Sequence, residues 1–304
     1  MQILSYCLNR YSFTYLVAVY LLFGIFTIYG EIAITHQLKA SIVFLSLFGI
    51  PHGAIDNVLF LSKHKLPQLT FYSLYLLTIS LYCCFWYYFP VFSLLFFLLI
   101  SAFHFGESQL SDYKLKTRFK KSLYTFWGVS MLSTLVYYNQ NELLLLCQEF
   151  NDTVKFIPVF NHHFIEYVFY GSNLILVSYL CVQAYRSKHE IQDLLTELFQ
   201  LFLIHLTFYL FPIIISFTLY FIFLHSIKVL AQEYNYLKEI RSELNLKKFI
   251  ILLLPHTFIS LLFLLVIYLC IQMQVVPISL FLFSIISISV ITLPHAIIMT
   301  YFYD

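Results

Sequence analysis

Six of the eleven histidines in this 304-residue chain lie inside apolar stretches, where an ionisable side chain is costly to place. They are His52, His104, His205, His225, His256 and His295. The other five fall in or beside polar segments, where a solvated imidazole is ordinary: His36, His64, His162, His163 and His189. The first six are therefore the residues whose position calls for a chemical explanation.

Imidazole is a ligand for zinc, copper, iron and nickel. A ligating histidine usually donates its second ring nitrogen to a carboxylate or a carbonyl. Asp56 follows His52 by four residues and Glu107 follows His104 by three, so on continuous helices each acid shares a face with its histidine. We therefore expect Asp56 and Glu107 to orient these two imidazoles.

The composition indicates the kind of element that must carry these residues. Hydrophobic residues make up 61% of the chain and charged residues 11%, against about 25% charged residues in a soluble domain. The net charge of +2 is too small to indicate nucleic-acid binding. The chain is predicted to be all-α, a polytopic transmembrane helical bundle that forms one integral membrane domain over residues 1–304.

Apolar runs of about 20 residues, the length that spans a bilayer, predict the helices. Ten candidates are present, and we expect about eight to ten of them to span: 11–29, 39–62, 69–89, 91–109, 122–138, 164–184, 194–210, 212–231, 249–271 and 278–301. The run 194–231 is too long for one span, and Pro212 is its only break, so a tight hairpin is predicted there. The stretch 139–163 is predicted to be an external loop.

Basic residues fall in alternate connections between these helices, which sets the orientation. With the N-terminus inside, the inner connections contain Lys63, Lys65, Lys114, Lys116, Arg118, Lys120, Lys121, Arg186, Lys188, Lys238, Arg241, Lys247 and Lys248. The outer connections contain little more than Lys39 and Lys155. Both termini are therefore predicted to be cytoplasmic.

This topology places five of the six histidines in one depth band. At about 1.5 Å of rise per residue, four lie about 8–11 Å from the cytoplasmic end of their spans and the fifth about 15 Å. The four are His104, His225, His256 and His295, and the fifth is His52; His205 lies near the opposite face. Each comes from a different span, so a cluster forms only in the assembled bundle, as a metal site or a haem with two axial histidines.

Pro51 and Gly53 flank the first of these histidines. Proline cannot donate to the helix ladder, so a kink is predicted directly before His52. Gly53 lets a neighbouring group approach closely. Pro255 before His256 and Pro294 before His295 repeat the arrangement.

Four segments together resemble a known family. "GIPHGAID" (49–56), "SAFHFGES" (101–108), "PIIISFTLYFIFLHS" (212–226) and the terminal "LPH" (293–295) resemble the Brp/Blh family of integral membrane β-carotene 15,15′-dioxygenases. The resemblance implies a non-haem Fe(2+) enzyme that cleaves the central double bond of β-carotene with O2 and gives two molecules of retinal. It makes His52, His104 and His225 iron ligands.

The resemblance also implies a setting. Members of the family are multi-pass proteins of the bacterial inner (cytoplasmic) membrane, often alongside a retinal-binding rhodopsin. β-Carotene dissolves in the bilayer, so we expect a pocket that opens laterally to lipid and is lined by aromatic and apolar side chains. Asp56 and Glu107 would soften the charge of a metal held by histidines alone.

One departure from the family pattern matters. The third motif of the family looks like HSxRH, whereas this chain reads "HSIKV", with Val229 where a further ligand histidine is expected. Either His295 or His256 then completes the site, or three histidines hold the iron, or the activity is lost. We take His295 as the fourth ligand and His256 as the alternative.

Two other functions remain open at this stage. The chain could be a carotenoid- or retinal-binding membrane protein that descends from the enzyme and has a degraded metal site. It could also be a bis-histidine haem or quinone redox protein, which no motif of the chain supports.

Overall fold

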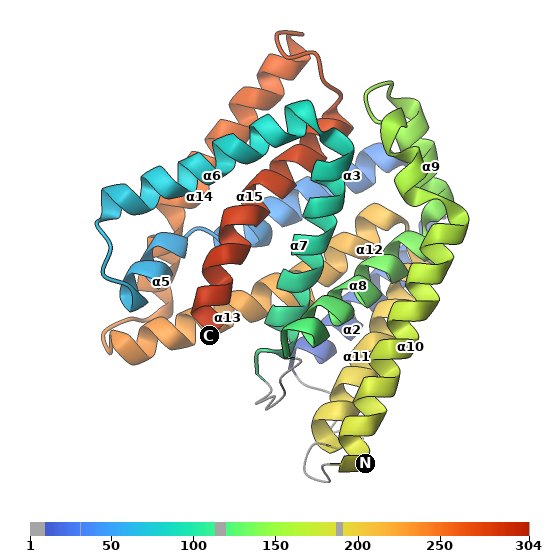
Figure 1. Cartoon of the computed structure of the whole chain (residues 1–304), viewed down its shortest axis with the longest axis horizontal. Coiled ribbons are helices and arrows are strands. Elements are labelled where there is room, and N and C mark those ends of the chain that lie inside the picture. The colour runs from blue at the N-terminus through green and yellow to red at the C-terminus, as the bar shows by residue number, and fades with distance from the viewer. Residues whose placement is uncertain (1–9, 31, 113–119, 187–190, 304) are drawn as a thin grey trace.

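The protein is a polytopic helical bundle, seen here in a computed structural model that describes residues 10–30, 32–112, 120–186 and 191–303 (Figure 1). No strand occurs in these described ranges. Eight helices within them are long and apolar enough to cross a membrane. The predicted fold class is therefore confirmed.

All ten predicted helices are present. Their bounds are α2 Arg10–Tyr29, α3 to α5 within Ile34–Lys63, α6 Gln68–Tyr88, α7 Pro90–Leu110, α8 Lys120–Tyr138, α10 His162–Arg186, α11 Ile191–Leu210, α12 to α13 within Ile213–Ile240, α14 Leu246–Gln272 and α15 Leu280–Tyr303. The eight spanning candidates leave out α8 and α11. The predicted break at Pro212 is confirmed, because α11 ends two residues before it and α12 begins directly after it.

The stretch 139–163 contains more structure than the predicted loop. It forms α9 (Gln140–Glu149) and a 3₁₀ helix, η2 (Val154–Phe160). Oε2 of Glu142 accepts a hydrogen bond from the backbone N–H of Ile213 at the start of α12, at 2.8 Å. A carboxylate is favourable at a helix N-terminus, although burial raises the pKa of Glu142. Glu142 therefore caps the start of α12.

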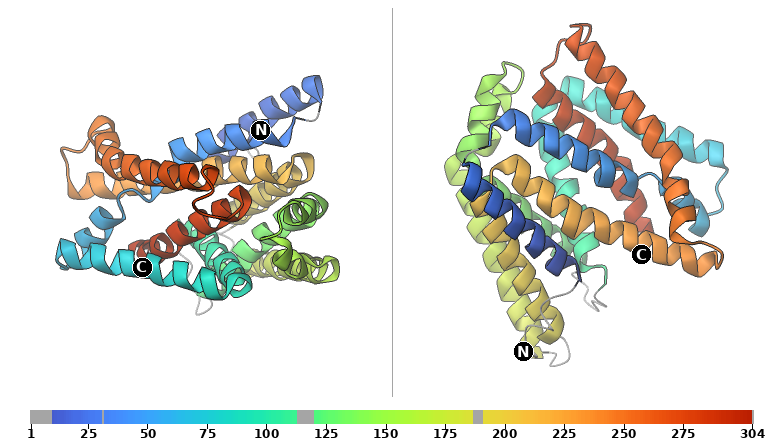
Figure 2. Two further views of the ribbon diagram at one scale, coloured as in Figure 1. Left: turned by 90° about the horizontal axis from the view of Figure 1, so that it is seen from above. Right: turned by 180° about the vertical axis from the view of Figure 1, so that it is seen from behind.

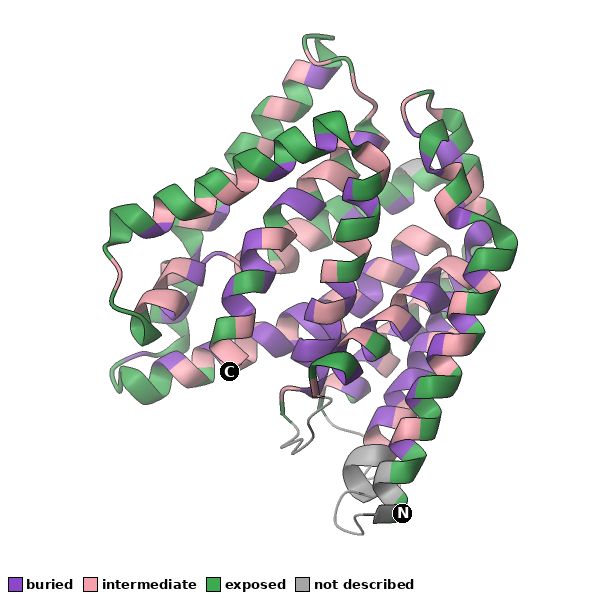
Figure 3. Ribbon diagram, viewed as in Figure 1, coloured by how far each residue is buried: buried purple, intermediate pink, exposed green. Residues whose placement is uncertain are grey.

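The middle of the bundle is formed by α7, α15 and the segment from α12 to α13 (Ile213–Tyr220 and Ile227–Ile240). Figure 1 shows α7 and α15 next to each other at the centre, and Figure 2 shows α6 and α14 on opposite faces of the molecule. Buried positions concentrate where the central helices meet, and exposed positions cover the outer sides of α6, α10 and α14 (Figure 3). This pattern gives a buried centre inside a lipid-compatible surface.

The second span is the least regular. α3 (Ile34–Phe44) passes into a π-helical turn, η1 (Leu45–Gly49), then into the short α4 (Ile50–His52), and a turn separates it from α5 (Asp56–Lys63). Pro51 lies in the short helix and cannot donate to the ladder. The predicted irregularity at Pro51 is thus present, as a widened turn followed by a break.

A second π-helical turn, η4 (Phe221–Ser226), connects α12 to α13 and contacts the first one. The Ser226 hydroxyl donates to the backbone carbonyl of Phe48. A Cβ added to Gly49 would lie 3.0 Å from the Phe221 ring, so the glycine permits the contact. π-Helical turns are frequent at functional sites, and both of these are next to a predicted ligand.

Helices α7 and α8 approach each other through glycine. A Cβ on Gly106 would lie 1.8 Å from the carbonyl oxygen of Tyr124, and a Cβ on Gly128 would lie 1.7 Å from that of Ala102. The obstructing atoms belong to the backbone and cannot rotate away. Small residues allow such close packing between membrane helices, and here they fix the helix that carries His104.

Gly128→Ala is expected to lower the stability of the bundle by about 1–3 kcal/mol, because the methyl group must separate α7 from α8. Thermal unfolding of the purified protein in detergent measures the change. Gly171→Ala is the matched control, since a Cβ at Gly171 meets no heavy atom within 4 Å. Equal melting temperatures for the two variants would contradict the packing account.

Candidate metal centre

Four buried histidines from four separate segments meet at the centre of the bundle. His52 ends α4, His104 lies on α7, His225 lies in η4 and His295 lies on α15. Their exposed fractions are 8%, 2%, 1% and 3%. We call these residues the histidine tetrad.

The four rings form a closed circuit of edge-to-face contacts. The ring centroids are 4.6 Å apart for His52 and His295, and 5.0 Å apart for His295 and His104. They are 4.9 Å apart for His104 and His225, and 5.3 Å apart for His225 and His52. The planes of neighbouring rings meet at 80° to 85°. The rings therefore surround one common point.

The separations suit a metal ion. One ring nitrogen from each of His52, His104 and His225 lies within 4.8 Å of the other two. Metal–imidazole bonds of about 2.1 Å bring ligand nitrogens to within about 4 Å of one another. Three nitrogens within 4.8 Å of one another can be drawn onto one ion by small side-chain shifts. The set of three does not include a nitrogen of His295, which meets the other rings through the contacts with His52 and His104.

Hydrogen bonds fix which nitrogen is protonated in three of the four rings. The Ser108 hydroxyl donates to the carbonyl of Phe105 at 3.0 Å, so its oxygen is left to accept from Nδ1 of His225 at 2.9 Å. Nδ1 of His295 donates to Oδ1 of Asp56 at 2.8 Å. Each of these two rings then keeps its lone pair on Nε2.

His52 has the same arrangement, because its Nδ1 donates to the backbone carbonyl of Gly49. A backbone carbonyl can only accept, so the lone pair of His52 also lies on Nε2. Carbonyl and carboxylate partners of this kind orient metal-ligating histidines. Three of the four imidazoles are therefore held ready to act as ligands through Nε2.

Several nitrogens of the tetrad are buried without a partner among the described residues. They are Nε2 of His225, Nε2 of His295 and both ring nitrogens of His104. A buried polar atom without a hydrogen bond costs about 1–3 kcal/mol. One metal ion at the common point would satisfy a nitrogen from each of His52, His104 and His225, so the residues present fit a bound metal.

The structure changes the predicted role of Asp56. The carboxylate binds His295 on another helix, so the predicted pairing with His52 is wrong. The rule for residues four apart requires a continuous helix, whereas the chain turns between α4 and α5, with φ −98° and ψ −1° at Gly53. The second carboxylate oxygen of Asp56 accepts from the Tyr75 hydroxyl at 3.1 Å.

Gly53 has the predicted close neighbour. A Cβ at this position would lie 3.3 Å from Nδ1 of His295, so the glycine lets the imidazole pack against the turn. The turn that separates Asp56 from His52 therefore also makes room for the ring that Asp56 orients.

Glu107 is buried beside the tetrad, on the turn of α7 that follows His104. Its Oε2 accepts from the hydroxyl of Thr300 at 2.9 Å, which directs the carboxylate toward α15. Because both ring nitrogens of His104 lack a hydrogen-bond partner among the described residues, the predicted bond from His104 to Glu107 does not form here.

The other two histidines of the predicted spans lie elsewhere. Nε2 of His256 lies 3.1 Å from the Tyr72 hydroxyl, and the ring stacks on that tyrosine outside the tetrad. His205 lies against Asn173 and Tyr138. The structure thus brings His295, and not His256, to the three family-motif histidines.

Val229, where the family pattern would place a histidine, is wholly buried in an apolar cluster with Ile55, Leu59 and Met299. Three other residues of the site were missed by the sequence reasoning: Ser108, Tyr75 and Thr300. Ser108 lies within the second motif, but its partner is His225 on another segment. All three contacts join different helical segments and have no sequence spacing to reveal them.

Comparisons with known proteins agree with this architecture. A family model described as Beta-carotene 15,15'-dioxygenase matches residues 43–303, which contain the whole histidine tetrad. No curated protein and no solved structure matches the chain. Because the match covers most of the 304 residues, the chain belongs to the β-carotene 15,15′-dioxygenase family.

Proposed function

We propose that the protein is a non-haem iron dioxygenase that cleaves β-carotene with O2 at the central 15,15′ double bond. One molecule of β-carotene and one of O2 then give two molecules of retinal. The observation that carries the proposal is the convergence of four buried imidazoles from four segments, three of which bring ring nitrogens within 4.8 Å of one another.

The donor set supports iron held by His52, His104, His225 and His295. Nitrogen ligands suit Fe(2+), and four of them leave positions on the metal for other molecules. When bound, the metal supplies the redox chemistry that lets O2 react with a hydrocarbon. Asp56 and Glu107 provide the nearby negative charge that offsets the charge of the ion.

The chain itself provides an apolar wall beside the tetrad. The ring of Phe105 lies 4.8 Å from that of His225, and the ring of Phe221 lies 5.3 Å from it, measured between centroids. The Phe221 ring also contacts His52 at 5.4 Å. These rings exclude water and offer an apolar surface to a polyene, as a hydrocarbon substrate requires.

The circuit of rings counts against a bis-histidine haem. A haem with two axial ligands needs a clear plane between them for the macrocycle. If His52 and His104 were the axial pair, the rings of His225 and His295 would occupy that plane. The centroid of each of these two rings lies about 5 Å from the centroids of both His52 and His104. A complete tetrad likewise gives no support to a degraded metal site.

We also propose that the protein resides in the bacterial inner membrane and that its product supplies a retinal-binding rhodopsin. The multi-pass helical fold is compatible with this location. Retinal is an apolar aldehyde that stays in the bilayer, so a membrane protein with a retinal-binding lysine is a fitting consumer.

Activity is tested in cells that accumulate β-carotene. Expression of the chain is expected to bleach the pigment and produce retinal at about two molecules per carotene lost, as the stoichiometry of central cleavage demands. Persistent pigment with well-expressed, iron-loaded protein would sink the proposal. A Soret band in the purified protein would support a haem instead.

Alanine at His52, His104, His225 or His295 is expected to remove most of the bound iron, because each change deletes one of four ligands. His256→Ala is the matched control and is expected to keep the iron content of the unchanged protein. Metal analysis of the purified variants measures both. Iron loss in the His256 variant with iron retained in the His295 variant would overturn the assignment of the fourth ligand.

Asp56→Asn is expected to weaken iron binding by about 10–100-fold, the usual effect of removing a carboxylate behind a ligating histidine. The amide keeps the shape and loses the charge that holds the Nδ1 proton of His295. Competition with a chelator measures the affinity. Asn57→Ala, which removes a bond to Tyr72 outside the tetrad, should have no effect; equal weakening in both variants would point to general damage of the turn.

A further inference from the structure

A groove lies between α6 and α15 on the lipid side of the site. It encloses about 150 Å³ and is lined by Phe60, Leu66, Phe71, Leu74, Tyr75, Thr78, Pro294, Ile297, Ile298 and Tyr301. Apart from hydroxyl groups, this lining is hydrocarbon. We propose that this groove admits one end of the carotenoid from the bilayer and leads it to the histidine tetrad; this inference rests on the proposed function.

Most of the lining residues lie on one face of α6 and one face of α15. On α6 they are Phe71, Leu74, Tyr75 and Thr78, and on α15 they are Pro294, Ile297, Ile298 and Tyr301. Both sets have the spacing i, i+3, i+4, i+7, which marks one face of a helix. At 1.5 Å per residue each face runs for about 10 Å, so the groove follows the two helices lengthwise and suits an elongated molecule.

The groove opens toward lipid. Leu74 on its rim is 53% exposed and Ile297 is 47% exposed, although both belong to membrane-spanning helices. Neighbouring α6 residues outside the groove, such as Leu81, are also exposed. A hydrocarbon dissolved in the bilayer can therefore reach the rim without crossing water.

The inner end of the groove adjoins the tetrad. Pro294 in the lining is the residue directly before His295. Tyr75 in the lining donates to Asp56, and the other oxygen of Asp56 accepts from His295. The side chain of Tyr75 thus separates the groove from the hydrogen-bonded pair of Asp56 and His295. Tyr75 is therefore the inner wall that the substrate meets.

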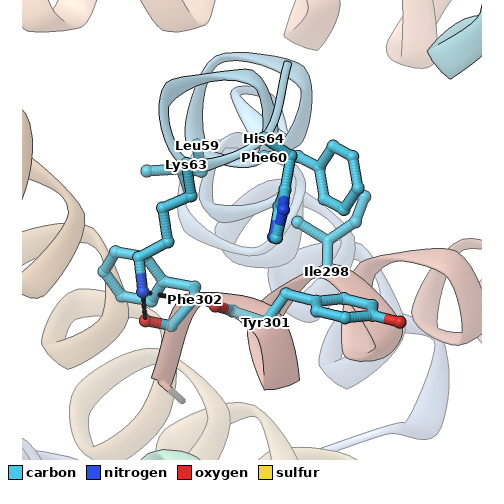
Figure 4. A pocket seen from close by; sticks show the side chains of 7 residues that line it. All are labelled: Leu59, Phe60, Lys63, His64, Ile298, Tyr301 and Phe302. Atoms are coloured by element: carbon cyan, nitrogen blue, oxygen red, sulfur yellow. Dashed lines mark hydrogen bonds between the residues drawn. The ribbon is translucent and has the colours of Figure 1, made fainter. Parts of the chain in front are cut away.

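The neighbouring pocket on the other side of Phe60 does not offer such a route. Leu59, Lys63, His64 and Phe302 close it together with residues shared with the groove (Figure 4). Lys63 lines one side of it and donates to the backbone carbonyls of Tyr301 and Phe302, at 3.2 Å and 2.7 Å. The Lys63 amine thus caps the C-terminal end of α15, and a charged group in the wall makes this pocket unsuitable for a hydrocarbon. The apolar groove is therefore the proposed entrance.

The size of the groove indicates how much of the substrate it takes. A dry cavity of about 150 Å³ accommodates a molecule the size of benzene. A carotenoid has a cyclic end group, larger than benzene, on a long polyene. The groove therefore takes at most part of the leading end group at one time, and the polyene has to follow it inward before the central double bond reaches the tetrad. The fully apolar end group of β-carotene matches the lining.

Tryptophan substitutions that fill the groove test the proposal. Thr78→Trp and Ile297→Trp place a bulky ring in it from α6 and from α15. Leu81→Trp and Ile291→Trp are the matched controls on the same two helices, at residues that are exposed and outside the lining. Each change is made in the full chain and, separately, together with His104→Ala, which prevents turnover.

Carotenoid that co-purifies with the His104→Ala protein from β-carotene-producing cells is measured by absorbance per protein. The groove variants are expected to hold at least fivefold less than the controls, and to make retinal at least fivefold more slowly in the active background. Their iron content should equal that of the controls, which shows that the bundle is intact.

Equal carotenoid in groove and control variants, including none in either, would overturn the inference and would leave a lipid acyl chain as the occupant of the groove. The proposed function fails separately. If the unchanged, iron-loaded chain makes no retinal while carotenoid binding still depends on the groove, the groove is a carotenoid site and the chain is not the dioxygenase.

Discussion

The desolvation of four imidazoles at one point within a membrane is the constraint on which the rest of the structure depends. Each ring has two nitrogens that need partners, and hydrocarbon supplies none. For His52, His225 and His295 the protein satisfies Nδ1 with a carbonyl, a hydroxyl and a carboxylate, and these partners direct each Nε2 lone pair inward. A metal ion shared between the rings would satisfy the remaining nitrogens together.

The irregular helices follow from this constraint. In a straight α-helix each interior carbonyl accepts from the backbone N–H four residues further on. The π-helical turn and the break around Pro51 release the carbonyl of Gly49 for His52 and bring Asp56 to a different helix. The glycine contacts between α7 and α8, and at Gly53, then let backbone and rings approach closely enough to close the circuit.

Much of the fold could be predicted because the hydrophobic runs are long and proline marks their ends, as at Pro212. The meeting of His52, His104 and His225 followed from depth and motif together. Depth alone could not separate His295 from His256, because both lie at similar distances from the same membrane face. What separates them is rotation about the helix axis: His295 faces α7 and Asp56, whereas His256 faces Tyr72.

The partners of the histidines were harder to predict. Spacing along the chain assigned Asp56 to His52, and a local turn made that assignment wrong. Tyr75 and Thr300 act across helices, so no sequence pattern contains them. Val229, where the family pattern would place a histidine, packs among Ile55, Leu59 and Met299. The fourth imidazole of the tetrad comes from His295 on α15 instead.

The central claim is that four imidazoles, with His295 as the fourth, hold one iron ion. X-ray absorption spectroscopy of the iron-loaded protein tests it most directly, since imidazole rings give characteristic scattering beyond the first shell. The account predicts four imidazole nitrogens at about 2.1 Å and three in the His295→Ala protein when iron is added back in excess. Three imidazoles in the unchanged protein, or the same number in both proteins, would contradict it.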